Sequence, residues 1–448
     1  MKILLVRPIS EKASNVMPLL GLGYLAYALR KHNVIYLDCV KEKMDLNRWY
    51  DYLKNNKFDY IGFQVFSCDV SSVLKMIESI KETKIIVGGP HISGKPDFVL
   101  HERIDYGFIG EAEIGFPKLL EEEYEEDVPN LVWKNKGKLI INKQEFHDHI
   151  DDFAVDWEKI KPDTYPIAPH GSFVKTPPSA PIIVTRGCIF SCNYCAGKKS
   201  TGTKLRKRSI HMIMDELTLL YNKFGIREFH FEDDNFTLDK QFAKEVCREI
   251  IKWKGNKKVS FACPNGVRLE TLDEELLNLM EKAGFYSFAI GIESGNNRVL
   301  KKMGRNVTKE IMKEKIELIA KTNIKMTGFC MMGYPTETLE EMEETARFTR
   351  ELPIHRVQYG NFHPLPGTPI YDELIQSGEI KDIDWDAYQD NTISYSPKGV
   401  TKEQLKKKME QSFRKFYLRP KIILGLIREI KNWYQFKVLV KRAIESFI

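Results

Sequence analysis

Three cysteines that lie within eight residues give the sequence its strongest chemical signal. Cys188, Cys192 and Cys195 occur in the segment TRGCIFSCNYCAGKK. Three thiolates at this spacing can hold three corners of one compact [4Fe–4S] cube, which normally takes four cysteine ligands. The fourth iron is then open to a substrate or a cofactor. The spacing therefore indicates a reactive iron–sulfur cluster rather than a simple electron carrier.

Two other uses of these cysteines are less consistent with the spacing. A structural zinc site needs a fourth Cys or His at finger-like spacing, and the nearby His170 and His211 match no finger pattern. A redox-active Cys-x2-Cys pair leaves the third cysteine unexplained. The remaining cysteines occur singly in apolar stretches and are expected to be small buried residues: Cys39, Cys68, Cys247, Cys263 and Cys330.

The first third of the chain is predicted to form a doubly wound, Rossmann-like parallel sheet. Short apolar runs alternate with helical patterns, which is typical of an α/β fold. Such sheets bind ligands at the carboxyl ends of their strands. Strands are expected at 2–6, 34–38, 60–66, 84–89 and 104–110, with helices over 19–31 and 70–82.

Residues 126–180 separate this domain (1–125) from a second α/β series. We expect a hairpin that turns at Lys136-Gly137, followed by a proline-rich linker. Residues 181–370 are predicted to form a partial, TIM-like (β/α)6 barrel, and 371–448 a helical C-terminal region. The barrel strands are expected at 182–185, 227–232, 259–263, 287–292, 325–332 and 356–362.

The aromatic residue before the last cysteine, Tyr194, makes the motif similar to the signature of the radical S-adenosylmethionine (SAM) superfamily. FEDDNF (231–236), GIES (291–294) and GFCMMGYPTET (328–338) resemble SAM-binding segments of that family, so the resemblance covers about 180–370. It implies that SAM binds the open iron and is cleaved to a 5′-deoxyadenosyl radical. The SAM contacts that it implies are Tyr194, Glu232, Asp233, Glu293, Ser294 and Gly328.

Several of these residues also have a purely structural interpretation. An acidic run at the end of a strand often caps a helix, and Gly328 and Gly333 can be packing glycines. The basic stretch KLRKRS (204–209) is either a solvated loop or a contact for a carboxylate or phosphate, which the Arg fork suits.

The first domain resembles the N-terminal domain of cobalamin-binding radical SAM proteins. PLLGLGYLAYALR, then Asp38, then GGPH and GEAE carry the resemblance over about 1–125. No D-x-H-x-x-G follows Asp38, so that motif supplies no histidine below the cobalt, and we expect His91 to be a loop residue rather than a cobalt ligand. The cobalamin contacts that the resemblance implies are Asp38, Ser67, Gly88, Gly89, Pro90, His91, Gly110 and Glu111.

Together the two resemblances imply a cobalamin-dependent radical SAM methyltransferase, of the group related to anaerobic tetrapyrrole cyclases and hopanoid-type enzymes, that methylates an unactivated centre. A non-methylating cyclase or oxidoreductase, or a SAM or redox sensor, are the alternatives. The implied cofactors are a [4Fe–4S] cluster, SAM and cobalamin. We expect a small-molecule or lipid-like substrate and an external electron donor such as flavodoxin or ferredoxin.

Bulk properties restrict the other partners. The 448-residue chain has a net charge of only +6, which does not indicate nucleic acid binding. Its start, MKILLVRPIS, is no signal peptide, and no window is apolar enough to span a membrane, so a cytoplasmic protein is expected. Residues 401–448 mix large apolar residues with Lys and Arg, which indicates either packed helices or a surface for peripheral membrane contact.

Overall fold

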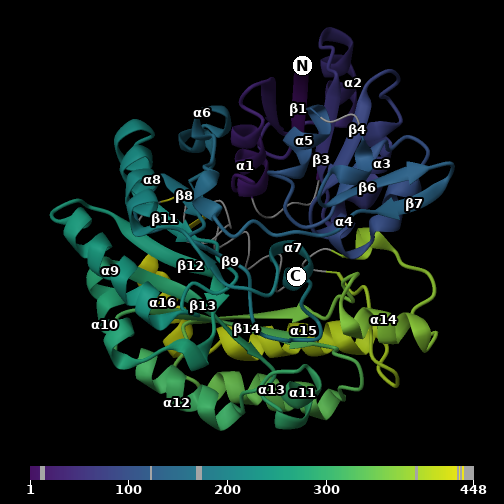
Figure 1. The fold of residues 1–448 in the computed structure, drawn as a ribbon. Coiled ribbons are helices and arrows are strands. Elements are labelled where there is room, and N and C mark those ends of the chain that lie inside the picture. Colours follow the sequence, from purple (N-terminus) through teal and green to yellow (C-terminus); the bar gives the residue numbers. More distant parts are fainter. Residues whose placement is uncertain are drawn as a thin grey trace. The chain divides into compact units, whose positions relative to one another are not determined.

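A computed structural model describes residues 1–10, 16–121, 124–167, 174–388, 392–430, 433 and 436–437. The chain divides into two compact units (Figure 1), each made of three segments. The first unit contains Met1–Pro166, Thr185–Met212 and Pro364–Gln389, and the second contains Ile167–Val184, Ile213–His363 and Asp390–Ile448. His170, considered above as a zinc ligand, lies outside the described residues.

The first unit is built on a seven-stranded sheet whose first five strands run parallel. This confirms the predicted Rossmann-like α/β fold. The parallel strands have the flavodoxin-like order 2-1-3-4-5, whose switch point lies between β1 and β3. In spatial order the strands are β2 (Asn33–Asp38), β1 (Lys2–Arg7), β3 (Tyr60–Gln64), β4 (Lys84–Gly88), β5 (Tyr106–Phe108), β6 (Leu131–Asn135) and β7 (Lys138–Ile141).

Alternate side chains of β1 enter two different cores, as expected for a sheet covered on both faces. Leu4 and Val6 pack with side chains of α2 and α3, whereas Ile3 and Leu5 pack with side chains of α1 and α5. The helices of this unit are α1 (Leu20–Ala28), α2 (Leu46–Asn55), α3 (Val70–Ile77), α4 (Pro90–Gly94), α5 (Gly115–Glu121), α6 (Trp157–Ile160), α7 (Gly197–Thr201) and α14 (Pro369–Gln376).

The predicted hairpin is β6–β7, and it extends the first sheet rather than lying in a separate segment. Lys136 and Gly137 both have positive φ, as the tight turn requires, and β6 pairs antiparallel with β5. The first segment of the first compact unit includes this hairpin and continues to Pro166. The predicted division of the chain into four parts, with boundaries after residues 125, 180 and 370, stays a prediction.

The second unit contains six parallel strands in sequence order, as predicted for a partial (β/α)6 barrel. In Figure 1 the helices lie outside the curved sheet. The strands are β8 (Ser179–Ile182), β11 (Glu228–Phe231), β12 (Ser260–Val267), β13 (Phe285–Glu293), β14 (Lys325–Met332) and β15 (Arg356–Asn361). The helices are α9 (Lys240–Lys254), α10 (Glu274–Ala283), α11 (Asn297–Lys302), α12 (Lys309–Ile319), α13 (Leu339–Glu351), α15 (Lys402–Tyr417) and α16 (Pro420–Glu429), with α8 (Ile210–Lys223) beginning in the first unit.

The first barrel strand lies three residues earlier than predicted. We expected it at 182–185, but β8 is Ser179–Ile182 and pairs with β11 from Ser179 onward. Its sequence, Ser-Ala-Pro-Ile, lacks the β-branched run by which a strand is recognised. Pro181 is tolerated because β8 is an edge strand, paired with β11 alone among the described strands.

Candidate functional site

The three clustered cysteines lie on one loop of the first unit, which we call the cysteine loop (residues 187–205). It connects the two-residue strands β9 (Thr185–Arg186) and β10 (Arg206–Lys207), which pair antiparallel. Cys188 and Cys192 are half-buried and Cys195 is exposed. The Gly197 backbone N–H donates to Cys195 Sγ at 3.4 Å, the kind of contact that tunes iron–sulfur clusters. Three thiols on one accessible loop fit a cluster that leaves one iron open.

The single cysteines differ from this group in burial. Cys39, Cys247, Cys263 and Cys330 are buried as predicted, whereas Cys68 is only half-buried. Burial raises the pKa of the Cys247 thiol to about 12. A thiol with so high a pKa is a poor source of the thiolate that a metal needs. Within the described residues, no group of three or more His, Cys, Asp and Glu has the arrangement of a single-metal site.

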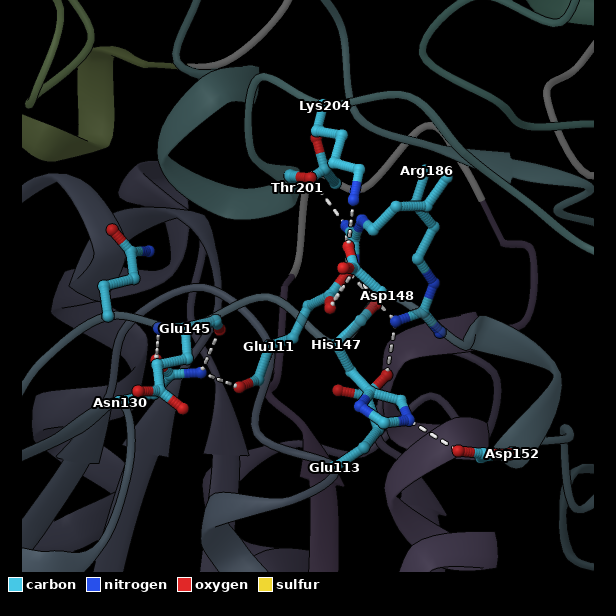
Figure 2. A network of polar contacts seen from close by, with 12 residues as sticks. Glu111, Glu113, Asn130, Glu145, His147, Asp148, Asp152, Arg186, Thr201 and Lys204 are labelled. Atoms are coloured by element: carbon cyan, nitrogen blue, oxygen red, sulfur yellow. Dashed lines mark hydrogen bonds and ion pairs between the residues drawn. The ribbon is translucent and has the colours of Figure 1, made fainter.

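The GEAE segment after β5 binds the cysteine loop through two arginines (Figure 2). The Glu111 carboxylate accepts one hydrogen bond from each terminal nitrogen of Arg206, Nη1 and Nη2, both at 2.7 Å. It also lies 3.1 Å from Arg186 Nη1. Glu113 accepts from the same Arg186 nitrogen at 2.8 Å. Burial pulls the pKa of Arg186 down, but Glu113 and Glu111 outweigh it, so the net effect raises this pKa. The basic stretch 204–209 therefore contacts a carboxylate through Arg206. This carboxylate is Glu111 of the same chain, not a bound ligand.

The residues assigned to cobalamin lie at the carboxyl edge of the first sheet, and two of the predicted segments meet there. Ser67, after β3, is hydrogen bonded to His91 Nδ1 at 3.0 Å. Gly88 ends β4 and Pro90 begins α4, so His91 lies in this helix and not in a loop as expected. Gly89 between them has φ +99°, and a Cβ would lie 3.0 Å from the Val65 carbonyl oxygen, so only glycine lets these two loops approach.

Two buried polar atoms at this edge have no hydrogen-bond partner among the described residues: Gln64 Oε1 at the end of β3 and His91 Nε2. Buried polar atoms are rarely left unpaired, and a ligand is one usual explanation. Burial lowers the pKa of His91 to about 4, so its ring is neutral at physiological pH. Gln64 also lies next to Gly21 of α1. Both atoms fit an edge that receives a polar ligand such as cobalamin.

Asp38 and Gly110 are held by contacts within the protein. Asp38 is buried, and its two oxygens accept from the backbone of Val40 and Lys41 and from Tyr165 Oη at 2.8 Å. Gly110 N donates to Ser93 Oγ at 2.9 Å, which ties the end of β5 to α4. Their assignment to cobalamin, like that of Glu111, stays a prediction.

In the second unit, three predicted SAM residues lie at the carboxyl ends of barrel strands, where such barrels carry their active sites. Glu232 and Asp233 directly follow β11, and Asp233 Oδ1 accepts from Val184 N at 3.2 Å. Glu293 ends β13 with φ +60°, 3.7 Å from Arg305. A left-handed backbone at a residue other than glycine is strained, and such strain is concentrated at functional sites.

The other predicted SAM residues are placed differently. Ser294 is buried and hydrogen bonded to Thr345 Oγ1 at 3.2 Å. A Cβ on Gly328 would lie 2.7 Å from the Ile292 side chain, so a glycine is needed for packing at this point of β14. Tyr194 is half-buried on the cysteine loop. Their contacts with SAM stay predictions.

Sequence reasoning missed four polar residues of these sites: Gln64, Glu113, Arg186 and Arg305. Gln64 is the one amide side chain in the strand-like run YIGFQVF. A polar side chain in a buried strand is unusual and could have indicated a functional residue. Glu113 completes the GEAE segment and Arg186 directly precedes Gly187, but nothing in their spacing indicates that they form a pair.

Comparison with known families and proteins agrees with this geometry. The radical SAM superfamily profile matches residues 182–349, and the B12 binding domain profile matches residues 6–120. An uncharacterized methyltransferase of Pyrococcus horikoshii is 28% identical, over 100% of this chain and 98% of its own. The cytidylyl-2-hydroxyethylphosphonate methyltransferase of Streptomyces wedmorensis is 27% identical over 85% of this chain and 82% of its own.

A solved structure has the same fold. The radical SAM methyltransferase TsrM of Kitasatospora setae, with cobalamin and a [4Fe–4S] cluster bound, matches with a TM-score of 0.71 and 18% identity, over 96% of this chain and 91% of its own. The chain therefore carries a B12-binding domain followed by a radical SAM domain. The two domains imply a [4Fe–4S] cluster, SAM and cobalamin as cofactors.

Proposed function

We propose that the chain is a cobalamin-dependent radical SAM methyltransferase that methylates an unactivated centre of a small-molecule or lipid-like substrate. The observation that carries this proposal is that the cysteine loop and the B12-type sheet belong to one compact unit. Two chemically different cofactors held by one unit suit a reaction that needs both. The two relatives described above are both methyltransferases by name.

Each group of side chains has a distinct task in this proposal. Cys188, Cys192 and Cys195 hold three irons and leave the fourth for SAM. Glu232, Asp233 and Glu293 offer acceptors for the amino and hydroxyl groups of SAM at the barrel edge. When bound, the cluster and one SAM would supply a carbon radical, and cobalamin would pass on a methyl group taken from a second SAM, which leaves S-adenosylhomocysteine. An external flavodoxin or ferredoxin provides the electron.

The test is anaerobic reconstitution with iron, sulfide and hydroxocobalamin, followed by a visible spectrum and a SAM-cleavage assay with reductant. We expect iron–sulfur absorption, a retained corrinoid band and 5′-deoxyadenosine, with S-adenosylhomocysteine as the sign of methyl transfer. Cys192→Ala should abolish the cluster, whereas Cys247→Ala, at a buried thiol, should keep it. Deoxyadenosine without S-adenosylhomocysteine would point to a cyclase or oxidoreductase, and a cluster without SAM cleavage would point to a sensor.

The lipid-like substrate is supported by the surface of the C-terminal helices. α15 and α16 pack on the barrel through contacts such as Tyr417 Oη with the Val357 backbone and Glu429 with Lys325. In and next to α16, large apolar side chains are left in solvent. These are Leu418, Ile423, Leu424 and Ile427, joined by Trp433 and Phe436.

Charge favours an anionic membrane as the surface that these side chains contact. Residues 401–448 hold 13 Lys and Arg against 4 Asp and Glu, a net charge of +9. Since the whole chain carries +6, residues 1–400 carry −3. Apolar residues mixed with excess basic charge are typical of helices that lie in a membrane interface. No helix among the described residues is long and apolar enough to span a membrane.

Vesicle flotation tests this contact. The full chain should float with vesicles that contain phosphatidylglycerol and much less with pure phosphatidylcholine. The double change Leu424→Asp with Ile427→Asp should reduce flotation, because it places charge on the exposed face of α16. Ile311→Asp, at an exposed apolar residue of α12, is the matched control. Equal flotation of all three proteins would refute the contact, as would equal behaviour of the chain with and without 401–448.

A further inference from the structure

Both ends of the cysteine loop are held by carboxylates of one segment, since Glu111 binds the arginine at each end and Glu113 binds the one at the N-terminal end. Arg186 and Arg206 are directly opposite each other in the β9–β10 pair, one at each end of the loop. Glu111 and Glu113, which follow β5, bind these two arginines. Strand β5 belongs to the parallel part of the first sheet. The loop is therefore attached to the carboxyl edge of that sheet.

At the N-terminal end, four contacts restrain the first cysteine. Arg186 is paired with Glu113 at 2.8 Å and its guanidinium lies 4.3 Å from the Tyr24 ring centroid. Gly187 has φ +93°, and a Cβ on it would lie 2.2 Å from the Lys204 carbonyl oxygen. Cys188 N donates to the Gly202 carbonyl at 3.2 Å. Since Cys188 is only two residues from Arg186, the position of Arg186 limits the position of its sulfur.

At the C-terminal end, Arg206 restrains the helix that follows the third cysteine. One nitrogen of its fork donates to the Thr201 carbonyl at 2.7 Å, at the end of α7, and the other to the His147 carbonyl at 2.9 Å. Both nitrogens also bind Glu111. A planar fork held by a carboxylate fixes its direction better than a lysine can. The end of α7 is thereby fixed relative to β5.

The four charged groups form a set without net charge, in which Arg186, Arg206 and Glu113 are buried and Glu111 is mostly buried. The side chains are 8% exposed for Arg186, 8% for Glu113, 12% for Glu111 and 2% for Arg206. Removing one partner from a buried pair leaves an uncompensated charge, which disturbs the structure much more than loss of a surface pair. A different ion pair on the same loop, Lys204 with Asp148 at 2.8 Å, is largely exposed, with side chains 72% and 59% exposed.

We propose that Glu111 and Glu113 are positioning residues for the iron–sulfur cluster, which they act on by fixing Arg186 and Arg206 at the two ends of the cysteine loop. This inference rests on the proposed function only in that the three cysteines hold a cluster. It gives the B12-binding domain a second task, which is to set the spacing of the cluster ligands. Neither carboxylate needs to touch the cluster, SAM or substrate.

The test compares Glu113→Gln and Glu111→Gln with Asp148→Asn in the full chain after anaerobic reconstitution. Each change replaces a carboxylate by an amide of the same shape. The readouts are bound iron, the rate of iron loss to an added chelator, and the electron paramagnetic resonance spectrum of the reduced cluster. We expect iron loss to be about tenfold faster or more in the two Glu variants, with a broadened spectrum, and to be unchanged in Asp148→Asn.

Equal rates and spectra for wild type and the two Glu variants would overturn the inference. Loss of the cluster from wild type itself would instead contradict the proposed function, so the two failures are distinct. If a Gln variant does not fold, Arg206→Lys keeps the charge and removes the fork. That variant should retain its circular dichroism spectrum and lose iron faster than wild type, and a wild-type rate would overturn the inference equally well.

Discussion

At the scale of single residues, spacing along the chain determined what could be predicted. Cys188, Cys192 and Cys195 could be predicted as cluster ligands because they are close in sequence. Glu111 and Arg206 are 95 positions apart, so their bidentate pair required the folded chain. We assigned Glu111 to cobalamin from the GEAE resemblance alone, and the structure adds two arginine partners that no local pattern could show.

Glu337 is a second residue whose environment only the fold defines. It lies in the GYPTET turn after β14, where Oε2 accepts from the backbone N–H groups of Gly333 at 2.8 Å and Tyr334 at 3.2 Å. Oε1 is buried and has no hydrogen-bond partner within the described ranges. Burial raises the pKa of this carboxyl from 4.5 to about 8, against the opposing effect of the two N–H groups. The acid therefore binds its proton more tightly in the folded protein.

This raised pKa predicts a pH-dependent stability. Below pH 4.5 the carboxyl is protonated in both states, so its contribution is complete there. The contribution is lost as the pH rises towards 8, at roughly 1.4 kcal/mol for each pH unit. Glu337→Gln should remove this loss, so the stability difference between variant and wild type should grow with pH. Urea unfolding of both proteins at several pH values measures it, and a constant difference would contradict the assignment.

At the scale of elements, hydrophobic periodicity predicted most strands to within a few residues, and side-chain chemistry explains the exceptions. β14 was predicted at its observed bounds, Lys325–Met332, because its apolar run has clear ends. β8 was misplaced because Ser179, Ala180 and Pro181 carry no strand signal. Residues Pro364–Gln389 follow the last barrel strand in sequence, yet they group with the first unit.

Gly94 explains how that segment can lie on α4. A Cβ at Gly94 would lie 2.1 Å from the Pro366 carbonyl oxygen, and Ile370 N donates to the Asn193 carbonyl of the cysteine loop at 3.2 Å. Gly94→Ala should displace the segment and cost about 1–3 kcal/mol, with faster hydrogen exchange in α14. Gly425→Ala in α16, where a Cβ meets nothing within 4 Å, is the control. Equal exchange in α14 would show that the close approach is unimportant.

At the scale of the whole molecule, the two compact units do not coincide with the two family domains. The radical SAM profile begins at residue 182, yet residues 185–212, which contain Cys188, Cys192 and Cys195, group with the B12-type sheet. Sequence reasoning identified both domains from their motifs. It could not assign the cysteine loop to the first unit, because that depends on contacts with residues before 150.

Binding of cobalamin should stabilise the two units unequally. Hydroxocobalamin at about one hundred times its dissociation constant adds roughly 2.7 kcal/mol to the folded state that binds it. We expect hydrogen exchange to slow in β3, β4 and the cysteine loop, and to change little in β13 and β14. Mass spectrometry of peptides from the unreconstituted protein, with and without the corrinoid, measures this. Uniform slowing over both units, or none, would contradict a binding edge confined to the first sheet.

The pairing of Glu111 and Glu113 with Arg186 and Arg206 also has a consequence for protein engineering. Consider a chimera that joins the B12-binding domain of one relative to the barrel of another at residue 181. Its two carboxylates would come from one parent and its two arginines from the other. Unless both partners carry matching charges, the hybrid buries two carboxylates or two guanidinium groups alone. Exchanging residues 1–166 together with 185–212 keeps the acids with their bases, so the interchangeable part of this enzyme is discontinuous in the gene.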